Sequence, residues 1–335
     1  MFPQILKIKM RARYIISALV SKTYSYIIPH LQAFKSKYPD IKLETFDDLN
    51  QFQNSDHWGR TDVLCMLFCS SSTLNESLRS NPLKWVHSFT SGVDAYMTPE
   101  FKSSPIPLTN SKGAYNDSLM EYVLASMLYF NKKFSILETQ KSNKEYKPFL
   151  MPTLYGSTLV ILGYGSIGKS IGKVGKSLGM KVIGVKRTAT EPDEGADEII
   201  ETQRLHEVLP QADFLAMAMP NHPSAHNIMS MREFALMKKT AVLVNIGRGN
   251  SINEDDLANA LNNDIIGGAA LDVFKTEPLP LTSPLWTAKN LIISPHNADM
   301  VVDLAHLCVG CFENHLINFL SGKPFTSVVD KEKGY

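Results

Sequence analysis

The chain of 335 residues contains no apolar run that approaches the roughly 18 residues needed for a membrane-spanning helix. It also has almost no net charge, because 34 Lys and Arg residues offset 33 Asp and Glu residues. Proteins that bind nucleic acid or an anionic membrane electrostatically carry a clear basic excess, so we expect neither partner. A content of 44% hydrophobic and 20% charged residues is typical of a globular protein, and the length favours about two domains.

Cysteine is scarce as well, with four residues at positions 65, 69, 308 and 311. Cys308 and Cys311 form a CxxC pair between His306 and His315, a combination that metal and redox sites use. The segment 304–320 has a helical pattern, however, and a zinc knuckle needs a turn between its ligand pairs. We therefore expect reduced thiols in an intracellular protein, and no metal.

Acidic residues are missing from the start of the chain, where Asp40 is the first and seven basic residues precede it. A basic, acid-free start can mark a mitochondrial presequence. Here it continues into an apolar run at 14–20 with the character of a strand. This favours a short ragged N-terminus on a cytoplasmic protein. Mitochondrial import is the weaker alternative, and the sequence assigns no role to residues 1–12.

A glycine motif, GYGSIG, occupies residues 163–168. An apolar run at 158–162 precedes it, and apolar residues with helical spacing follow it up to residue 178. A strand, a glycine turn and a helix in this order form the dinucleotide-binding fingerprint. Gly163 permits a tight turn, Gly165 permits close approach of a pyrophosphate, and Gly168 permits close packing of the helix on the strand.

The helix after this motif begins near Ser166 and Ile167. The first N–H groups of a helix have no partner within it, and they attract anions together with the helix dipole. We expect the pyrophosphate of a dinucleotide to bind there.

The rest of the chain alternates strands and helices. In residues 13–110, strands are predicted at 14–20, 41–46, 63–68 and 83–89, with a helix at 27–38. A crossing between domains is predicted at 109–113, followed by a helix at 117–131 and a loop that includes 141–152. Further strands are predicted at 158–162, 181–185, 198–200, 214–219, 241–246, 267–273 and 291–294. Further helices are predicted at 204–209, 231–237, 254–261 and 301–320. Such alternation predicts a doubly wound parallel sheet that binds ligands at the carboxyl ends of its strands.

Three chemically informative residues follow strands of this predicted sheet: Arg248, Glu277 and His296. Each alone fits a solvated surface position. Together at the ligand end of one sheet they match the reduction of a 2-keto acid. Arg248 would bind the carboxylate with paired N–H groups and polarise the keto oxygen. His296 would act as general acid and base, and Glu277 would orient its ring and favour the charged form.

In the segments around these residues and the glycine motif, the chain resembles the D-isomer-specific 2-hydroxyacid dehydrogenase family, and the glyoxylate/hydroxypyruvate reductases in particular. The resemblance covers residues 85–330 and is carried by GYGSIG, LVNIGRGNSINEDDLANAL, GGAALDVFKTEPLP and LIISPHNA. It implies Arg248, Glu277 and His296 as the catalytic residues. It also implies that the backbone at Ser91, Gly92 and Val93 helps to bind the substrate carboxylate. Residues 1–80 match only in outline.

The resemblance further implies a fold. A Rossmann nucleotide domain would span 111–299, and a smaller flavodoxin-like α/β substrate domain would combine 1–110 with 300–335. Family members are commonly homodimers through the nucleotide domain. We therefore expect a homodimer that acts on a small 2-keto or 2-hydroxy acid.

The family pattern also implies cofactor contacts. Pro220, Ile246 and Gly247 would line the cofactor cleft, Arg248 and His296 would border it, and Asp272 would contact the nicotinamide carboxamide.

One position departs from the pattern of NAD-using relatives, which carry an acidic residue at the end of the second strand to bind the ribose hydroxyls. Here the position is Lys186, followed by Arg187 and Thr188. An acid would repel a 2′-phosphate, whereas these three side chains would attract one. The sequence therefore predicts NADP(H) in preference to NAD(H), against the alternative of an exposed basic turn.

The leading hypothesis is thus an NADPH-dependent reductase of small 2-keto acids such as glyoxylate, hydroxypyruvate or a larger 2-oxo acid. Candidates for the pocket wall are Phe68, Tyr96, Met97 and Trp286, and the substrate itself stays open. The alternative is a dinucleotide-sensing binding module, because corepressors of the family keep the same three residues. The NADPH prediction and the lack of an extended tail favour the enzyme. Formate dehydrogenase is disfavoured, because it pairs its histidine with glutamine.

Overall fold

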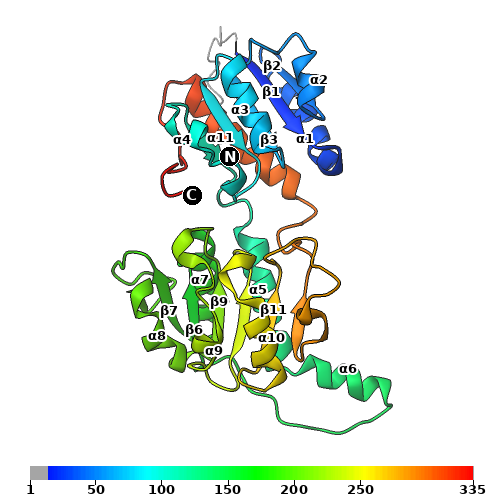
Figure 1. The fold of residues 1–335 in the computed structure, drawn as a ribbon, viewed down its shortest axis with the longest axis vertical. Coiled ribbons are helices and arrows are strands. Elements are labelled where there is room, and N and C mark those ends of the chain that lie inside the picture. Colours follow the sequence, from blue (N-terminus) through cyan, green and yellow to red (C-terminus); the bar gives the residue numbers. More distant parts are fainter. Residues whose placement is uncertain (1–13, 335) are drawn as a thin grey trace, which may run out of the picture. The chain divides into compact units, whose positions relative to one another are not determined.

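The computed structural model describes residues 14–334, and its chain divides into two compact units (Figure 1). The first unit comprises the residues up to Ala114 and those from Val302 onward, and the second is Tyr115–Val301. The sequence-based boundaries lie at 110/111 and 299/300, and the roles assigned to the two domains stay predictions. The ragged N-terminus predicted for residues 1–12 lies outside the described residues.

The first unit contains a five-stranded sheet of order β2-β1-β3-β4-β5, in which all neighbours are parallel. Its strands are β1 (Ile15–Val20), β2 (Lys42–Phe46), β3 (Val63–Leu67), β4 (Trp85–Ser88) and β5 (Leu108–Asn110). Its helices are η1 (Lys22–Ile27), α1 (Ile28–Lys37), α2 (Leu49–Gln53), α3 (Ser71–Ser80), η2 (Asp94–Tyr96), α4 (Pro99–Ser103) and α11 (Leu304–Leu320). This strand order is that of flavodoxin-like folds, which confirms the predicted fold class.

The crossing point predicted at 109–113 is partly wrong. Thr109 and Asn110 form the end of β5, because they pair with His87 and Ser88 of β4. The chain passes into the second unit only after Ala114. A three-residue strand is too short to show a period-2 pattern, so the sequence alone does not reveal it.

The C-terminal helix α11 belongs to the core of the first unit. Phe312 is fully buried on α11 and stacks on Trp85 of β4, with ring centroids 5.4 Å apart. The Phe312 ring also packs against Phe34 of α1, with ring centroids 5.5 Å apart. Cys308 and Cys311 lie one turn apart on this continuous helix, and all four cysteines are free thiols.

A buried histidine pair lies beside this aromatic cluster. The His87 side chain is fully buried, its Nδ1 lies 2.7 Å from Thr109 Oγ1, and its Nε2 has no hydrogen-bond partner among the described residues. The His315 ring lies 5.8 Å away. Burial, reinforced by the neighbouring His315, lowers the pKa of His87 well below its ordinary value, and burial also lowers the pKa of His315.

We expect this pair to make the first unit sensitive to acid. A histidine whose pKa is lowered by folding binds its proton more readily in the unfolded chain. Stability is therefore complete above about pH 6.5 and falls below it, by roughly 1 kcal/mol per pH unit for each histidine. Denaturant unfolding between pH 7.5 and 5 measures this slope. His87→Gln should flatten it, and His226→Gln, at an exposed site, should not. An unchanged slope in His87→Gln would contradict the assignment.

The second unit is built on a seven-stranded parallel sheet of order β12-β11-β10-β9-β6-β7-β8 (Figure 1). Its strands are β6 (Thr158–Leu162), β7 (Lys181–Lys186), β8 (Glu198–Glu201), β9 (Phe214–Met217), β10 (Val242–Asn245), β11 (Gly268–Leu271) and β12 (Leu291–Ile293). The order reverses between β6 and β9, which is the Rossmann arrangement with one strand added at the β12 edge. The predicted doubly wound sheet is confirmed.

The second unit also contains helices of two lengths. The longer ones are α5 (Asn116–Asn131), α6 (Phe134–Ser142), α7 (Ser166–Ser177) and α10 (Glu254–Asn262). The short ones are η3 (Thr202–Arg204), α8 (Leu205–Val208), η4 (Leu209–Gln211), η5 (Pro223–Ala225), α9 (Met231–Phe234), η6 (Gly249–Ser251) and η7 (Pro284–Thr287). As predicted for residues 254–261, α10 follows an N-cap at Asn253, whose side chain accepts a hydrogen bond from the Asp256 N–H.

Two predicted strands extend two residues beyond the observed strand ends. The segments 214–219 and 267–273 end as strands at Met217 and Leu271, because the neighbouring strands β10 and β12 end at Asn245 and Ile293 and offer no further partners. The predicted helix 231–237 is also shortened. The α-helix α9 ends at Phe234, and turns follow it, in one of which the Met237 N–H donates to Phe234 O.

The sequence-based prediction contains no helix at α6, and its loop overlaps the last two residues of this helix. No residue of α6 is buried, so the helix has no core-facing stripe that periodicity could reveal. Among residues 14–334, no helix combines the length and apolar character needed to cross a membrane.

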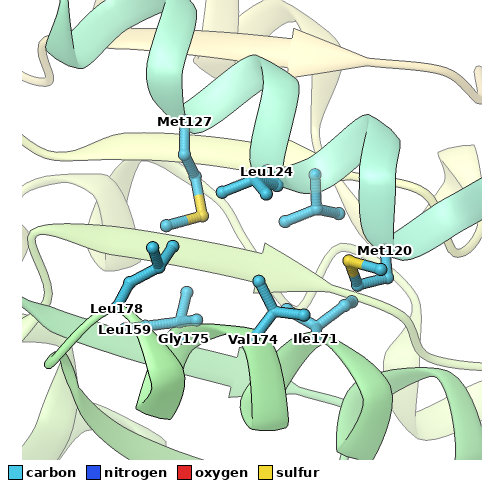
Figure 2. Close-up of a pocket in the computed structure, with 9 residues that line it drawn as sticks. Met120, Leu124, Met127, Leu159, Ile171, Val174, Gly175 and Leu178 are labelled. Atoms are coloured by element: carbon cyan, nitrogen blue, oxygen red, sulfur yellow. The ribbon is translucent and has the colours of Figure 1, made fainter. Parts of the chain in front are cut away.

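A small hollow lies between α5 and α7 (Figure 2). Its lining is apolar throughout and consists of Met120, Val123, Leu124, Met127, Leu159, Ile171, Val174, Gly175 and Leu178. None of the predicted site residues lines it. Binding sites for small polar molecules need convergent polar groups, so we interpret the hollow as a packing gap.

Candidate active site

The three predicted catalytic residues follow three adjacent strands. Strands β10, β11 and β12 lie side by side, and their last paired residues are Asn245, Leu271 and Ile293. Arg248, Glu277 and His296 come after these strand ends, in that order. Because the strands are parallel, the three loops emerge at one edge of the sheet.

His296 and Glu277 are in direct contact. The distance from His296 Nδ1 to Glu277 Oε2 is 2.7 Å. The other oxygen of Glu277 accepts a hydrogen bond of 2.9 Å from the Phe274 N–H, which fixes the carboxylate. A carboxylate only accepts hydrogen bonds, so Nδ1 carries the hydrogen and Nε2 is the ring atom that can exchange a proton with a ligand. The His296 side chain is 48% exposed, which leaves its ring accessible.

Arg248 is held by the loop that it begins. The side chain of Asn245, fully buried at the end of β10, accepts from the Gly247 N–H at 3.0 Å and donates to Arg248 O at 3.0 Å. The hydroxyl of Ser251 donates to the same carbonyl at 2.6 Å. The Arg248 guanidinium donates from Nη1 to Gly247 O at 2.8 Å. The backbone that carries the guanidinium is therefore rigidly defined.

A further carboxyl group, Asp299, lies among these residues. Burial raises its pKa, the positive charges of His296 and Arg248 act in the opposite direction, and Asp272 reinforces the rise. Asp299 is thus within electrostatic reach of both His296 and Arg248. The structure brings all three predicted catalytic residues into one region of the second unit.

Asp272 lies beneath the loop that carries His296. It is 1% exposed, and its Oδ1 accepts hydrogen bonds from the Ser294 hydroxyl at 2.6 Å and from the Asn297 and Ala298 N–H groups at 3.0 and 3.1 Å. Asp272 therefore fixes the ends of β11 and β12 relative to each other. Its predicted contact with a nicotinamide stays a prediction.

The glycine turn has the geometry expected for a dinucleotide. Gly163 has φ +99°, and a Cβ there would lie 2.7 Å from the backbone of Ala218. A Cβ at Gly168 would lie 2.6 Å from Gly163 O, so α7 packs tightly on the turn. A Cβ at Gly165 would meet nothing within 4 Å. Open space at Gly165 beside the N-terminus of α7 fits a pyrophosphate.

The remaining predicted cofactor residues also lie at this edge. Ser166 and Ile167 are the first two residues of α7, and the Ser166 hydroxyl accepts a hydrogen bond of 2.8 Å from Asn116. Lys186 ends β7, and Arg187 and Thr188 follow it as exposed residues.

Pro220 follows β9, and Ile246 and Gly247 follow β10. A Cβ at Gly247 would lie 2.7 Å from Met219 O, so these two chain segments pass very close to each other.

The predicted carboxylate-binding turn, Ser91, Gly92 and Val93, belongs to the first unit and follows β4. Ser91 O accepts a hydrogen bond of 2.6 Å from Asn110, and Gly92 O accepts one of 2.7 Å from the Thr90 hydroxyl.

The candidates for the pocket wall differ in accessibility. Phe68 and Trp286 are about half exposed, at 50% and 49%. Tyr96 is 3% exposed and packs in the core of the first unit, so it is a structural residue. Met97 is half-buried and packs against the same core.

Sequence reasoning missed four residues that shape this site: Tyr122, Asn245, Ser294 and Asp299. A weak signal exists for Asn245, which is a polar residue inside an apolar strand. Ser294 directly precedes the Pro-His pair, at a strand end. Asp299 follows His296 by three residues but belongs to no motif. Tyr122 carries no local signal, since only its hydrogen bond with Ser294 brings it to the site.

A Rossmann sheet with a dinucleotide turn and a paired histidine and glutamate at its ligand edge defines a dinucleotide-dependent enzyme. The comparisons with known proteins agree. The family model for the D-isomer specific 2-hydroxyacid dehydrogenase, NAD binding domain, matches residues 124–298. The chain belongs to this family.

Two relatives and one solved structure illustrate the similarity. An uncharacterized protein in the proB 3′ region of Corynebacterium melassecola is 32% identical over 263 residues, covering 76% of this chain and 84% of the relative. The glyoxylate reductase of Thermococcus gammatolerans is 28% identical over 259 residues, covering 75% of this chain and 77% of the relative. The NADPH-dependent glyoxylate/hydroxypyruvate reductase of Sinorhizobium meliloti, solved with NADP and sulfate, is 26% identical with a TM-score of 0.82. The match covers 96% of this chain and 100% of that structure's chain.

The chain is therefore an oxidoreductase, a D-2-hydroxyacid dehydrogenase of the 2-ketoacid reductase kind that uses NAD(H) or NADP(H). The family predicted from the four sequence segments is confirmed.

Proposed function

We propose that this protein reduces small 2-oxo acids to D-2-hydroxy acids with NADPH as the preferred cofactor. The observation that carries the proposal is the 2.7 Å pair between His296 and Glu277, formed next to the loop of Arg248. Glyoxylate reductase and glyoxylate/hydroxypyruvate reductase are the names of two similar proteins, and they support short 2-oxo acids as the substrates.

Arg248 has the task of binding the substrate. Its planar guanidinium can donate two parallel N–H bonds to a carboxylate, and it places positive charge next to the keto oxygen. The loop held by Asn245 and Ser251 keeps its backbone in place, which reduces the entropy lost on binding. The turn at Ser91, Gly92 and Val93 is proposed to bind the same carboxylate through backbone N–H groups.

His296 has the task of moving the proton. Reduction places negative charge on the keto oxygen, and a protonated imidazole donates from Nε2 to that oxygen. Glu277 accepts from Nδ1, so it orients the ring and stabilises the imidazolium. In the oxidation direction the neutral ring takes the proton from the hydroxyl. One His–Glu pair therefore serves both directions.

The cofactor is proposed to bind along the carboxyl ends of β6, β7, β9 and β10. It supplies the hydride when bound. The turn from Gly163 to Gly165 and the first N–H groups of α7, at Ser166 and Ile167, would hold the pyrophosphate. Pro220, Ile246 and Gly247 would line the cleft, and Asp272 would reach the carboxamide.

The basic end of β7 supports NADPH. Lys186 and Arg187 add two positive charges at the point where NAD-using relatives carry an acid, and Thr188 adds a hydroxyl. Each can form a charge-assisted or neutral hydrogen bond with a 2′-phosphate.

The proposed function is tested by following NADPH oxidation over a panel of glyoxylate, hydroxypyruvate and larger 2-oxo acids, with NADH in parallel. We expect turnover of at least one acid, a D-configured product, and a higher kcat/KM with NADPH. Lack of turnover across the panel would contradict the reductase. Equal or better efficiency with NADH would contradict only the cofactor preference.

The homodimer and the cytoplasmic location stay predictions. Exposed apolar side chains on α6 and the loop after it support a dimer through the second unit, and Figure 1 shows where the ribbon of α6 lies. They include Phe134 at 45% exposed, Tyr146 at 98% and Leu150 at 93%. Light scattering on the purified chain measures its mass, and the mass of a single chain would contradict the dimer.

A further inference from the structure

His296 has an unusual backbone conformation. Its φ is +53°, in the left-handed region that residues other than glycine seldom occupy. Such a conformation persists only where the surrounding contacts hold it. The contacts on both sides of His296 therefore decide where its ring lies.

Both sides of the loop are tied to Asp272. Two residues before His296, the Ser294 hydroxyl donates to Asp272 Oδ1 at 2.6 Å. Directly after His296, the N–H groups of Asn297 and Ala298 donate to the same oxygen at 3.0 and 3.1 Å. Asp272 is nearly fully buried, so water does not compete for these bonds.

Helix α5 holds the same loop from the other direction. The Tyr122 hydroxyl lies 2.7 Å from Ser294 Oγ. The single hydroxyl hydrogen of Ser294 goes to the carboxylate of Asp272, so Tyr122 is the donor in its bond with Ser294. Burial raises the pKa of Tyr122, which keeps this donor protonated. Four residues earlier, Ser118 donates from its hydroxyl to Ala298 O.

Ser118 and Tyr122 lie on one face of α5, since residues four apart on a helix are neighbours. Ser118 contacts the loop after His296, and Tyr122 contacts it before His296. Helix α5 is therefore hydrogen-bonded to the chain both before and after His296, the residue proposed to exchange the proton.

We propose that Tyr122 and Ser118 are positioning residues, which set the orientation of the His296 ring through Ser294, Asp272 and Ala298. This inference rests on the proposed role of His296 as general acid and base. It gives α5, which none of the sequence motifs includes, a role in positioning the residue that transfers the proton. Neither residue touches the substrate in this proposal.

The test begins with Tyr122→Phe, which removes only the hydroxyl. With the most active acid of the panel, we expect kcat to fall by about 10- to 100-fold, because small misplacement of a catalytic group costs rate. KM should stay within about twofold, because substrate binding depends on Arg248. Tyr129→Phe is the matched control, since Tyr129 lies on the same helix and its hydroxyl donates to Glu138 at 3.5 Å. It should leave kcat unchanged.

Ser294 supplies a second, independent variant. Ser294→Ala should lower kcat as Tyr122→Phe does, and Ser294→Thr, which keeps the hydroxyl, should restore much of it. Thermal unfolding of each variant shows whether it is folded. If Tyr122→Phe does not fold, Ser294→Ala and Ser118→Ala carry the same test.

A double-variant cycle separates positioning from general structure. In a His296→Ala background, Tyr122→Phe should cause no further loss of kcat, because there is no ring left to orient. An undiminished loss in that background would overturn the inference. So would a kcat within twofold of the parent for both Tyr122→Phe and Ser294→Ala. Full activity of His296→Ala would instead overturn the proposed function, so the two failures are distinguishable.

Discussion

Alanine in place of His296 is expected to lower kcat by about 10²- to 10⁴-fold, the usual contribution of a positioned acid–base group. The reason is that His296 Nε2 is the proposed source of the proton for the oxygen that the reaction makes negative. Cofactor binding should change little, because the glycine turn and α7 are untouched. Steady-state kinetics with a 2-oxo acid and NADPH measure both quantities.

The matched control is His206→Ala. His206 forms the same kind of pair, with its Nε2 2.8 Å from Glu233 Oε1, and its side chain is 40% exposed. It lies on α8, in the segment between β8 and β9, and it belongs to none of the loops that follow β10, β11 and β12. We expect kcat of this variant within about twofold of the parent. A His296→Ala variant that keeps more than a tenth of the parent kcat would rule out His296 as the acid and base.

Replacing Lys186 and Arg187 together by alanine is expected to raise KM for NADPH by about 10- to 100-fold, because charge-assisted hydrogen bonds to a 2′-phosphate are worth roughly 1.5–3 kcal/mol each. KM for NADH should stay within about twofold, since NADH lacks this phosphate. The measurement is kcat/KM with both cofactors at fixed 2-oxo acid.

A Lys181→Ala variant is the control for this change of charge, because Lys181 is the first residue of β7 and lies at the opposite end of the same strand. It should leave both cofactors unaffected. Lys186→Asp would restore the acid of NAD-using relatives, and we expect it to favour NADH. Equal losses with NADH and NADPH in the double variant would mean that the basic turn does not recognise the phosphate.

Most of the fold is predictable from the sequence, and the errors have physical causes. Long runs such as 15–20 and 63–67 are buried on both faces, so their apolar character identifies them as strands. The three-residue strand β5 is too short for a pattern. Strand ends at Met217 and Leu271 depend on where neighbouring strands stop, which the local sequence does not contain.

The candidate site divides in the same way. Arg248, Glu277 and His296 can be found from the sequence, because each follows an apolar strand and has a side chain suited to the reaction. The residues that hold these three in place by hydrogen bonds are harder to find from the sequence. Asn245 donates a hydrogen bond that orders the Arg248 loop, and Ser294 donates one that links the end of β12 to Asp272. In the sequence, neither residue differs from the polar residues that commonly occur at strand ends.

The sequence by itself determined the alternation of strands and helices, the glycine turn at 163–168 and the chemical types available at the strand ends. These follow from local periodicity and from the backbone freedom of glycine, which a few neighbouring residues encode. Only the tertiary structure decided that His296 meets Glu277 across 19 residues and that Tyr122 reaches Ser294 across 172. Such contacts depend on the order of strands in a sheet and on how a helix packs against it, and no local pattern specifies either.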